Sequence, residues 1–249
     1  MIIINRMACI RLFVVTMLVT TSAQAGIQLN GTRVVYPANE REVSLGLVND
    51  GTEARLVQSW VDSGDVRERP EDSKAPFIIT PPMTRVDPGK GQTLRIIFSG
   101  STMPQDRESV FWLNILEIPP KPAKKYNDES ENYVQMAVRS RIKIFYRPQN
   151  LPDNPDLAVN KLTWRLMSFN SNSAVMKCIN ETPYNVSFSD VSFENGPVNR
   201  SVSKGGMCPA KSEHDFTLSG SLIKSEGKLK LVYINDYGAF VDHAATFYK

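Results

Sequence analysis

Histidine and cysteine are scarce in this chain, with two and three copies among 249 residues. His214 and His243 lie in unrelated sequence contexts, and the chain contains no Gly-rich phosphate loop, His-x-x-x-His pair or nucleophile elbow. No pair of carboxylates stands out as a candidate for general acid–base catalysis. These absences argue against an enzyme, against a bound cofactor and against a metal centre.

Long hydrophobic runs are also absent, except at the N-terminus, where residues 12–19 are mostly apolar. Arg6 and Arg11 precede this run, and Ala23-Gln24-Ala25 follows it as an A-x-A cleavage site. The run is shorter than a membrane-spanning helix requires, so a membrane anchor is the weaker alternative. We therefore predict that residues 1–25 are a signal peptide and that the exported protein does not insert into the membrane.

Charge of one sign is not in excess. The 29 basic and 26 acidic residues give a formal charge of +3, and loss of Arg6 and Arg11 with the signal peptide leaves +1. Because a large basic field is missing, we do not expect nucleic acid to be a partner.

The cysteines that remain after export form an even pair. Cys9 belongs to the predicted signal peptide, which leaves Cys178 and Cys208. A disulfide is the favoured interpretation, because exported proteins mature in oxidising compartments. It would close a loop of about 30 residues and contribute roughly 3 kcal/mol to stability.

The first half of the chain is rich in segments with strand character. Turn signals such as Asn49-Asp50-Gly51, Asp87-Pro88-Gly89 and Pro119-Pro120 separate them. The expected strands are 31–37, 43–47, 54–61, 77–80, 94–98, 110–118 and 133–146. Seven strands in about 120 residues indicate an immunoglobulin-like sandwich.

The second half is again β-rich, and no long amphipathic helix appears in the sequence. The expected strands are 162–166, 174–179, 185–193, 229–233 and 240–248. Residues 149–155 contain prolines and asparagines and little that could pack, so we predict a linker there. The fold class is therefore all-β, with two β-sandwich domains over residues 26–148 and 156–249.

Two further segments carry weak signals. The polar stretch between Pro119 and Tyr133 predicts a mobile loop, and it lacks the spacing and the glycine of a calcium loop. Asn180-Glu181-Thr182 matches a glycosylation acceptor, a short pattern that is frequent by chance, so we attach no function to it.

The most informative segment runs from Tyr133 to Pro148. Val134, Met136 and Val138 alternate with other residues, as in a β-strand, and the segment ends in basic residues and a proline. Such a strand can pair with another chain, filling apolar pockets and anchoring a terminal carboxylate. Alternation alone leaves open whether the three apolar residues face a partner or their own core.

Several motifs, in order along the chain, resemble the periplasmic chaperones of the chaperone–usher pilus pathway. The resemblance extends from the first strand nearly to the C-terminus. It rests on Thr80-Pro81-Pro82, on residues 103–114 (MPQDRESVFWLN) and 117–120 (EIPP), on 141–148 (RIKIFYRP), on 180–184 (NETPY) and on 233–238 (YINDYG).

This resemblance implies both a fold and a task. It implies two immunoglobulin-like domains set as a boomerang, and a non-enzymatic periplasmic protein that uses no ATP. The chaperone would donate a β-strand to pilus subunits that lack their final strand, and then deliver them to an outer-membrane usher. The resemblance does not decide whether the free chaperone forms a dimer that covers its own exposed strand.

The resemblance also assigns site residues. Arg33 and Lys143 match the cations that hold the terminal carboxylate of a bound subunit, and Val134, Met136 and Val138 match the donor strand. Lys143 is an odd position and the three apolar residues are even, so in an unbroken strand they face opposite ways. A twist, a bulge or the reach of the lysine side chain is then needed to reconcile them.

Three more residues, Glu108, Arg147 and Asp236, match the interdomain ion network of the family. The loop before the donor strand is longer than in the shortest members and lacks the cysteine pair of the long-loop branch. We therefore favour the short-loop branch, which builds rod-like pili.

Two other classes of protein compete with this interpretation. A secreted adhesin would carry a glycan pocket on its loops and would not need Arg33 or Lys143. An exported hydrolase would need a nucleophile–base pair, and none is evident.

Overall fold

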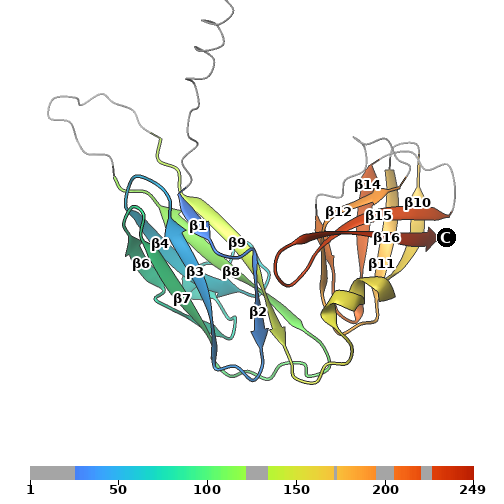
Figure 1. Cartoon of the computed structure of the whole chain (residues 1–249), viewed down its shortest axis with the longest axis horizontal. Helices are drawn as coiled ribbons and strands as arrows, with labels where there is room; N and C mark the ends of the chain where they lie inside the picture. The colour runs from blue at the N-terminus through green and yellow to red at the C-terminus, as the bar shows by residue number, and fades with distance from the viewer. Residues whose placement is uncertain (1–25, 122–133, 171–172, 195–204, 220–225) are drawn as a thin grey trace, which may run out of the picture.

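A computed structural model describes residues 26–121, 134–170, 173–194, 205–219 and 226–249. Sixteen strands and two short 3-10 helices make up its regular structure in these ranges. Figure 1 shows two β domains that meet at an angle, as in a boomerang, with the polypeptide crossing between them at the bend. The all-β, two-domain fold expected from the sequence is confirmed.

The N-terminal domain is a sandwich of two sheets. The first sheet has the order β1-β3-β7-β5 and the second has the order β2-β9-β8-β4-β6. The strands of the first sheet are β1 (Ile27–Leu29), β3 (Glu42–Asn49), β7 (Gly91–Phe98) and β5 (Phe77–Thr80). Those of the second are β2 (Arg33–Pro37), β9 (Val138–Arg147), β8 (Ser109–Ile118), β4 (Arg55–Asp62) and β6 (Met83–Val86). A 3-10 turn, η1 (Pro70–Asp72), follows β4.

Alternating residues of the two sheets fill the space between them, as the period of two requires. Leu94, Ile96, Leu113 and Ile144 are fully buried there. Tyr36 is also buried, and its hydroxyl donates to a carbonyl of the 40–41 turn and accepts from the backbone N–H of Phe98. Tyr36 therefore ties the end of β2, in the second sheet, to β7 of the first sheet.

The C-terminal domain is one curled sheet with the order β13-β12-β15-β16-β10-β11-β14. Its layers are continuous because β10 pairs in parallel with β16 at Trp164 and Phe247. The strands are β10 (Thr163–Phe169), β11 (Ser173–Asn180), β12 (Val186–Phe193), β13 (Gly206–Cys208), β14 (Ser212–Ser219), β15 (Gly227–Ile234) and β16 (Phe240–Tyr248). The 3-10 helix η2 (Pro155–Lys161) precedes them, capped by the Asn154 side chain.

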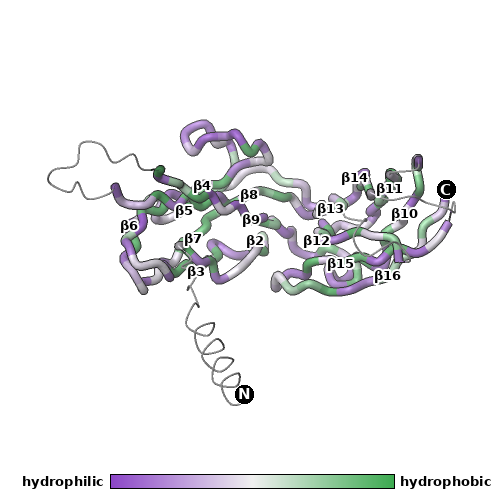
Figure 2. Tube along the Cα trace, turned by 90° about the horizontal axis from the view of Figure 1, so that it is seen from above, coloured by the Kyte–Doolittle hydropathy of each residue, from purple (hydrophilic) through white to green (hydrophobic). Residues whose placement is uncertain are grey.

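The curled sheet encloses a second core around Trp164, Phe188 and Phe216, whose rings contact one another. The disulfide between Cys178 on β11 and Cys208 on β13 joins strands from opposite parts of the sheet, with 6.1 Å between their Cα atoms. Figure 2 shows apolar and hydrophilic residues interspersed along the strands of both domains, as sheets with one face in a core require.

The structure corrects several expected strands. The first half holds nine strands rather than seven, because β1 and β6 are short and their residues lack a clear alternation. In the second half β13 and β14 were not expected, since most of the β14 side chains are polar and exposed. The signal peptide and most of the predicted mobile loop lie outside the described residues.

The strand expected over 133–146 instead begins at Val138 and ends at Arg147. Val138 pairs with Glu117 on β8, and beyond Ile118 the next partners would be Pro119 and Pro120. Proline has no N–H to donate to a ladder, so the pairing stops there. The side chain of Gln135 donates to the carbonyls of those two prolines instead.

Candidate functional site

Two cations lie side by side where the domains meet. Arg33 begins β2 and Lys143 lies in the middle of β9, and the parallel pairing of these strands makes them direct partners. Each cation reaches across to the C-terminal domain. Arg33 Nη1 donates to the carbonyl of Ile234 at 2.8 Å, and Lys143 Nζ donates to the hydroxyl of Ser187 at 2.9 Å.

Neither cation forms a salt bridge within the described ranges of the chain, and the Nε–H of Arg33 is buried there without a hydrogen-bond acceptor. Desolvation, together with the neighbouring charge of Arg33, lowers the pKa of Lys143 to about 8. Burial also lowers the pKa of Arg33, and Asp236 partly offsets this effect. Two adjacent, partly desolvated cations with spare donors are suited to bind an anion such as a carboxylate.

Glu108, Arg147 and Asp236 come together beside these cations. Arg147 ends β9, and its Nε donates to Glu108 at 2.7 Å. Its two terminal nitrogens donate to the carboxylate of Asp236 at 2.7 and 3.0 Å. One arginine of the N-terminal domain thus joins an acid of its own domain to an acid of the other domain.

Glu108 has a second role in this junction. Its carboxylate accepts from the backbone N–H of Asn185 at 2.8 Å and from the side chain of Asn185 at 3.2 Å. Burial raises the pKa of Glu108 despite the opposing effect of Arg147 and Asn185. The charge of Arg147 is stabilised by both acids, so its pKa is raised in spite of desolvation.

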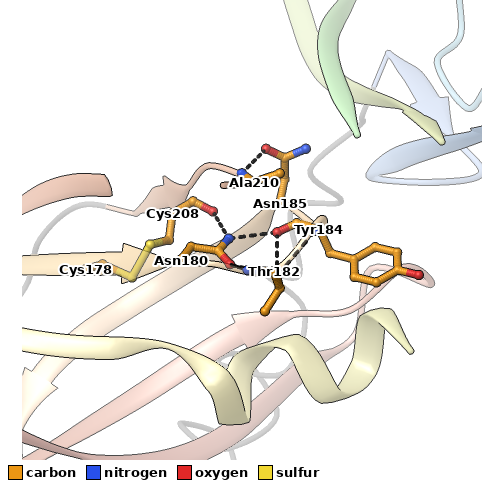
Figure 3. The surroundings of a disulfide bond; sticks show 7 residues. All are labelled: Cys178, Asn180, Thr182, Tyr184, Asn185, Cys208 and Ala210. Atoms are coloured by element: carbon orange, nitrogen blue, oxygen red, sulfur yellow. Dashed lines mark hydrogen bonds between the residues drawn. A yellow bond between two sulfur atoms is a disulfide. The ribbon is translucent and has the colours of Figure 1, made fainter. Parts of the chain in front are cut away.

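The loop that carries Asn185 is itself held rigidly. Figure 3 shows the buried Asn180 side chain donating to the carbonyls of Tyr184 and Cys208 and accepting from Thr182, next to the disulfide. The same figure shows Asn185 accepting from the backbone of Ala210. Because the Asn180 side chain is buried and fully bonded, it serves this turn rather than standing free on the surface.

The apolar stripe is exposed. Val134, Met136 and Val138 have 91%, 74% and 51% of their surface accessible. Figure 1 shows β9 running from the far end of the N-terminal domain towards the bend, and the ladder with β2 covers only its second half, from Lys143. On the side away from β8, residues 138–142 have no strand partner in the ranges that the structure describes.

The ladder between β8 and β9 has no bulge, so alternate residues of β9 keep to opposite faces throughout. Ile142, Ile144 and Tyr146 pack in the core of the N-terminal domain, and Val138 shares their parity. Lys143 and Arg147 point the other way, towards the C-terminal domain. Val138, the one residue of the apolar stripe that lies within β9, therefore faces away from the cations.

Sequence reasoning did not identify Ser187 and Asn185 as part of the site. Both belong to the other domain, and Ser187 lies 44 positions from the lysine that it contacts. The alternation around Val186 and Phe188 marks a strand but carries no sign of its neighbour. A buried acid at the end of β4, Asp62, was also missed, because a single aspartate beside a turn is usually exposed.

Nowhere in the described ranges do three or more His, Cys, Asp or Glu side chains gather as a metal ion would require. The same ranges contain no helix with the length and hydropathy needed to cross a membrane.

Comparison with known proteins gives one consistent family. Residues 26–152 match the N-terminal domain of PapD, the pili and flagellar-assembly chaperone, and residues 157–245 match the C-terminal domain of the pili assembly chaperone PapD. The chaperone protein FimB/FhaD of Bordetella pertussis is 37% identical over 229 residues, which cover 90% of this chain and 89% of that protein. The probable fimbrial chaperone YadV of Escherichia coli K12 is 39% identical over 92% of this chain and 93% of its own length.

Solved structures of pilus chaperones have a similar fold. The crystal structure of the YadV chaperone superimposes with a TM-score of 0.72 at 34% identity, covering 89% of this chain and all of that one. A chain from the Salmonella enterica complex of the SafA pilin with the SafB chaperone has a TM-score of 0.74 at 24% identity, a likeness of fold, over 90% of this chain and 96% of that one. Since both domains match in order and over nearly their full length, the chain belongs to the family of PapD-like pilus-assembly chaperones.

Proposed function

We propose that this protein binds pilus subunits in the periplasm by donating β9 as a missing strand and by holding the terminal carboxylate of the subunit between Arg33 and Lys143. The adjacency of these two cations, with no carboxylate of the described chain bound to them, is the observation that carries the proposal. The predicted signal peptide and the disulfide support an exported, oxidising location.

The direction of the bound strand follows from the ladder. The open edge of β9 covers residues 138–142, and β2 occupies the same edge from Lys143 onward. A subunit strand whose last residue reaches Arg33 and Lys143 must therefore lie along 138–142 with its C-terminus towards β2. It would run parallel to β9, as β2 does.

The apolar stripe would complete the core of the subunit. Val138 continues the row that fills the core of the N-terminal domain, so an open sandwich placed beyond it receives apolar side chains from the same strand. Burying a residue such as Met136 contributes about 1.5–3 kcal/mol, before the costs of ordering. Charge-assisted hydrogen bonds to the carboxylate add roughly 1.5–3 kcal/mol each and fix the register.

The partners follow from the family. The Salmonella enterica structure contains a pilin bound to the SafB chaperone, which supports a pilus subunit as the client here. Delivery to an outer-membrane usher belongs to the same proposal. A dimer in which two exposed stripes cap one another is the second state that the exposure of Val134 and Met136 favours when no client is present.

Co-purification from the periplasm tests the proposal. A pilus subunit is co-expressed with the wild type, with Lys143→Ala and with the control Lys230→Ala, which alters an exposed lysine on β15. We expect the wild type and the control to hold a soluble subunit, and Lys143→Ala to lose it to aggregation or proteolysis. Equal recovery with all three proteins would show that the carboxylate is not anchored at Lys143.

A further inference from the structure

A buried carboxylate lies behind the open half of β9. Asp62 ends β4 and has no accessible surface. Its oxygens accept from the side chain of Asn114 at 2.7 Å and from the backbone N–H of Gly64 at 2.8 Å. Arg141 of β9 donates to both oxygens, one of them at 2.9 Å through its Nε.

Arg139 of β9 joins the same group. Its Nε and one terminal nitrogen donate to Asn114 Oδ1 at 2.9 and 2.6 Å, and its other terminal nitrogen donates to the carbonyl of Val66 at 2.7 Å. It also lies 3.7 Å from the carboxylate of Asp62. Three parts of the N-terminal domain, β4, β8 and the loop after β4, thus converge on two arginines of one strand.

Aromatic rings complete the arrangement. The guanidinium of Arg139 lies 4.7 Å from the centre of the Trp60 ring, and that of Arg141 lies 4.7 Å from the Trp112 ring. Cation–π contacts of this kind favour the charged guanidinium and fix the plane in which it lies. Desolvation opposes ionisation of Asp62, but the hydrogen bonds from Arg141, Asn114 and Gly64 outweigh it and lower the pKa of this carboxyl.

These contacts all involve the half of β9 that has an open edge. Arg139 and Arg141 lie in residues 138–142, which are paired on one edge with β8 and have no strand on the other edge within the described structure. A strand held on one side only opens more readily than a central one. The contacts of Arg139 and Arg141 with Asp62 hold this half of β9 on the face opposite Val138.

We propose that Asp62 is a positioning residue, which keeps residues 138–142 of β9 in register and ready to pair before a subunit arrives. This inference rests on the proposed function, because it assigns to Asp62 the preorganisation of the same donor strand. A strand ordered in advance costs less conformational entropy on binding, so loss of Asp62 weakens the complex although Asp62 does not touch the subunit. Its loss also leaves two guanidinium groups near each other without their carboxylate.

Stability alone does not test this idea, because removing one partner of a buried ion pair destabilises a protein whatever the role of that pair. The informative readout is local. Amide hydrogen exchange at residues 138–142 reports the opening of the strand, and exchange along β3 and β7 in the other sheet reports the rest of the domain.

The experiment compares Asp62→Asn with Glu42→Gln, which removes a carboxylate that pairs with Arg95 on the exposed face of the other sheet. The binding probe is a synthetic peptide of alternating valine and threonine with a free C-terminal carboxylate. For Asp62→Asn we expect exchange at 138–142 to rise about tenfold more than exchange along β3 and β7, and peptide affinity to fall about tenfold. We expect Glu42→Gln to match the wild type in both readouts.

The milder Arg141→Lys keeps the charge but loses the two-oxygen contact and the fit to Trp112, and we expect a smaller change in the same direction. Unchanged exchange at 138–142, or faster exchange without weaker peptide binding, would overturn the role of Asp62. Lys143→Ala separates this outcome from failure of the proposed function. If that variant also binds the peptide normally, the anchor is wrong, whatever Asp62 does.

Discussion

At the scale of residues, the surroundings of Lys143 disfavour its positive charge. Lys143 is partly buried beside Arg33, and the hydroxyl of Ser187 is the acceptor that the structure provides for it. Burial and like charge together lower the pKa of Lys143 to about 8. A carboxylate bound beside Lys143 would offset both effects, since it would supply the missing counter-charge.

We expect this residue to make the proposed binding of a C-terminal carboxylate dependent on pH. The free protein has Lys143 with a pKa of about 8, and a bound carboxylate raises that pKa because it favours the charged form. Affinity is therefore complete well below pH 8 and falls as the pH rises through 8, by about tenfold between pH 7 and pH 9. Titration calorimetry with a carboxylate peptide measures this trend.

Two controls define the cause. Lys143→Arg stays charged over the whole range, so its affinity should be flat between pH 7 and pH 9. An amidated peptide should bind weakly at both values. A wild-type affinity that does not change with pH would show that Lys143 does not face the carboxylate.

At the scale of elements, the two halves of β9 have different surroundings. Its second half is central to the N-terminal sandwich, with β8 on one side and β2 on the other. Its first half leaves one edge open, and exposed apolar residues precede it in the chain. An open edge next to apolar side chains is a site for pairing with another chain.

Polar substitution of the stripe should remove binding and leave folding intact. Met136→Ser loses about 1.5–3 kcal/mol of burial in the complex, which corresponds to roughly ten- to hundredfold weaker binding of a subunit. The melting temperature should not change, because Met136 is 74% exposed in the free protein. Leu157→Ser, an exposed leucine of η2, is the matched control. Equal recovery of the subunit with both variants would count against strand donation.

The disulfide between β11 and β13 is a second feature at this scale. Cys178→Ala with Cys208→Ala should lower the free energy of unfolding by about 2–5 kcal/mol, because the unfolded chain regains the freedom of a loop of about 30 residues. Denaturant unfolding followed by fluorescence measures the change, and reduction of the wild type should reproduce it. A midpoint unchanged by both treatments would show that the curled sheet does not need this link.

At the scale of the whole molecule, ion pairs and hydrogen bonds join the two domains in addition to those of Arg33 and Lys143. Arg147 joins Glu108 to Asp236, Glu108 joins Asn185, and Lys211 of the C-terminal domain pairs with Asp106 at 2.9 Å. We propose that this network holds the cleft at the spacing that Arg33 and Lys143 need. Its partly buried members matter most, because exposed pairs contribute little.

Asp236→Ala should therefore loosen the joint. The bidentate pair with Arg147 is lost, and with it about 1.5–3 kcal/mol of charge-assisted hydrogen bonding between domains. Small-angle scattering should show a broader distribution of shapes, and the carboxylate peptide should bind more weakly. Asp242→Ala, on an exposed position of β16, should leave both readouts unchanged. A scattering curve for Asp236→Ala that matches the wild type would show that other contacts set the angle.

Local patterns in the sequence were enough to predict several strands, the disulfide and the family of this protein. The bounds expected for β5 and β16 agree with the structure to the residue, the parity of two exported cysteines predicts the bridge that forms, and the motifs around Arg141–Pro148 and Tyr233–Gly238 indicate the family. These features depend on residues that are neighbours in the chain, or on the oxidising compartment, so they can be predicted without knowledge of the tertiary structure.

Tertiary structure alone decided which residues distant in the sequence come into contact. Ser187 meets a lysine 44 positions away, and Asp62 meets an arginine 79 positions away. Neither meeting has a local signature, because it depends on which strands pair and on how the two domains are set. The unbroken register of β9 likewise fixed which face each side chain takes, and the two prolines that follow β8 fixed where β9 begins. A strand carries its alternation in its own residues, but its partners and its ends are set by the chain that packs beside it.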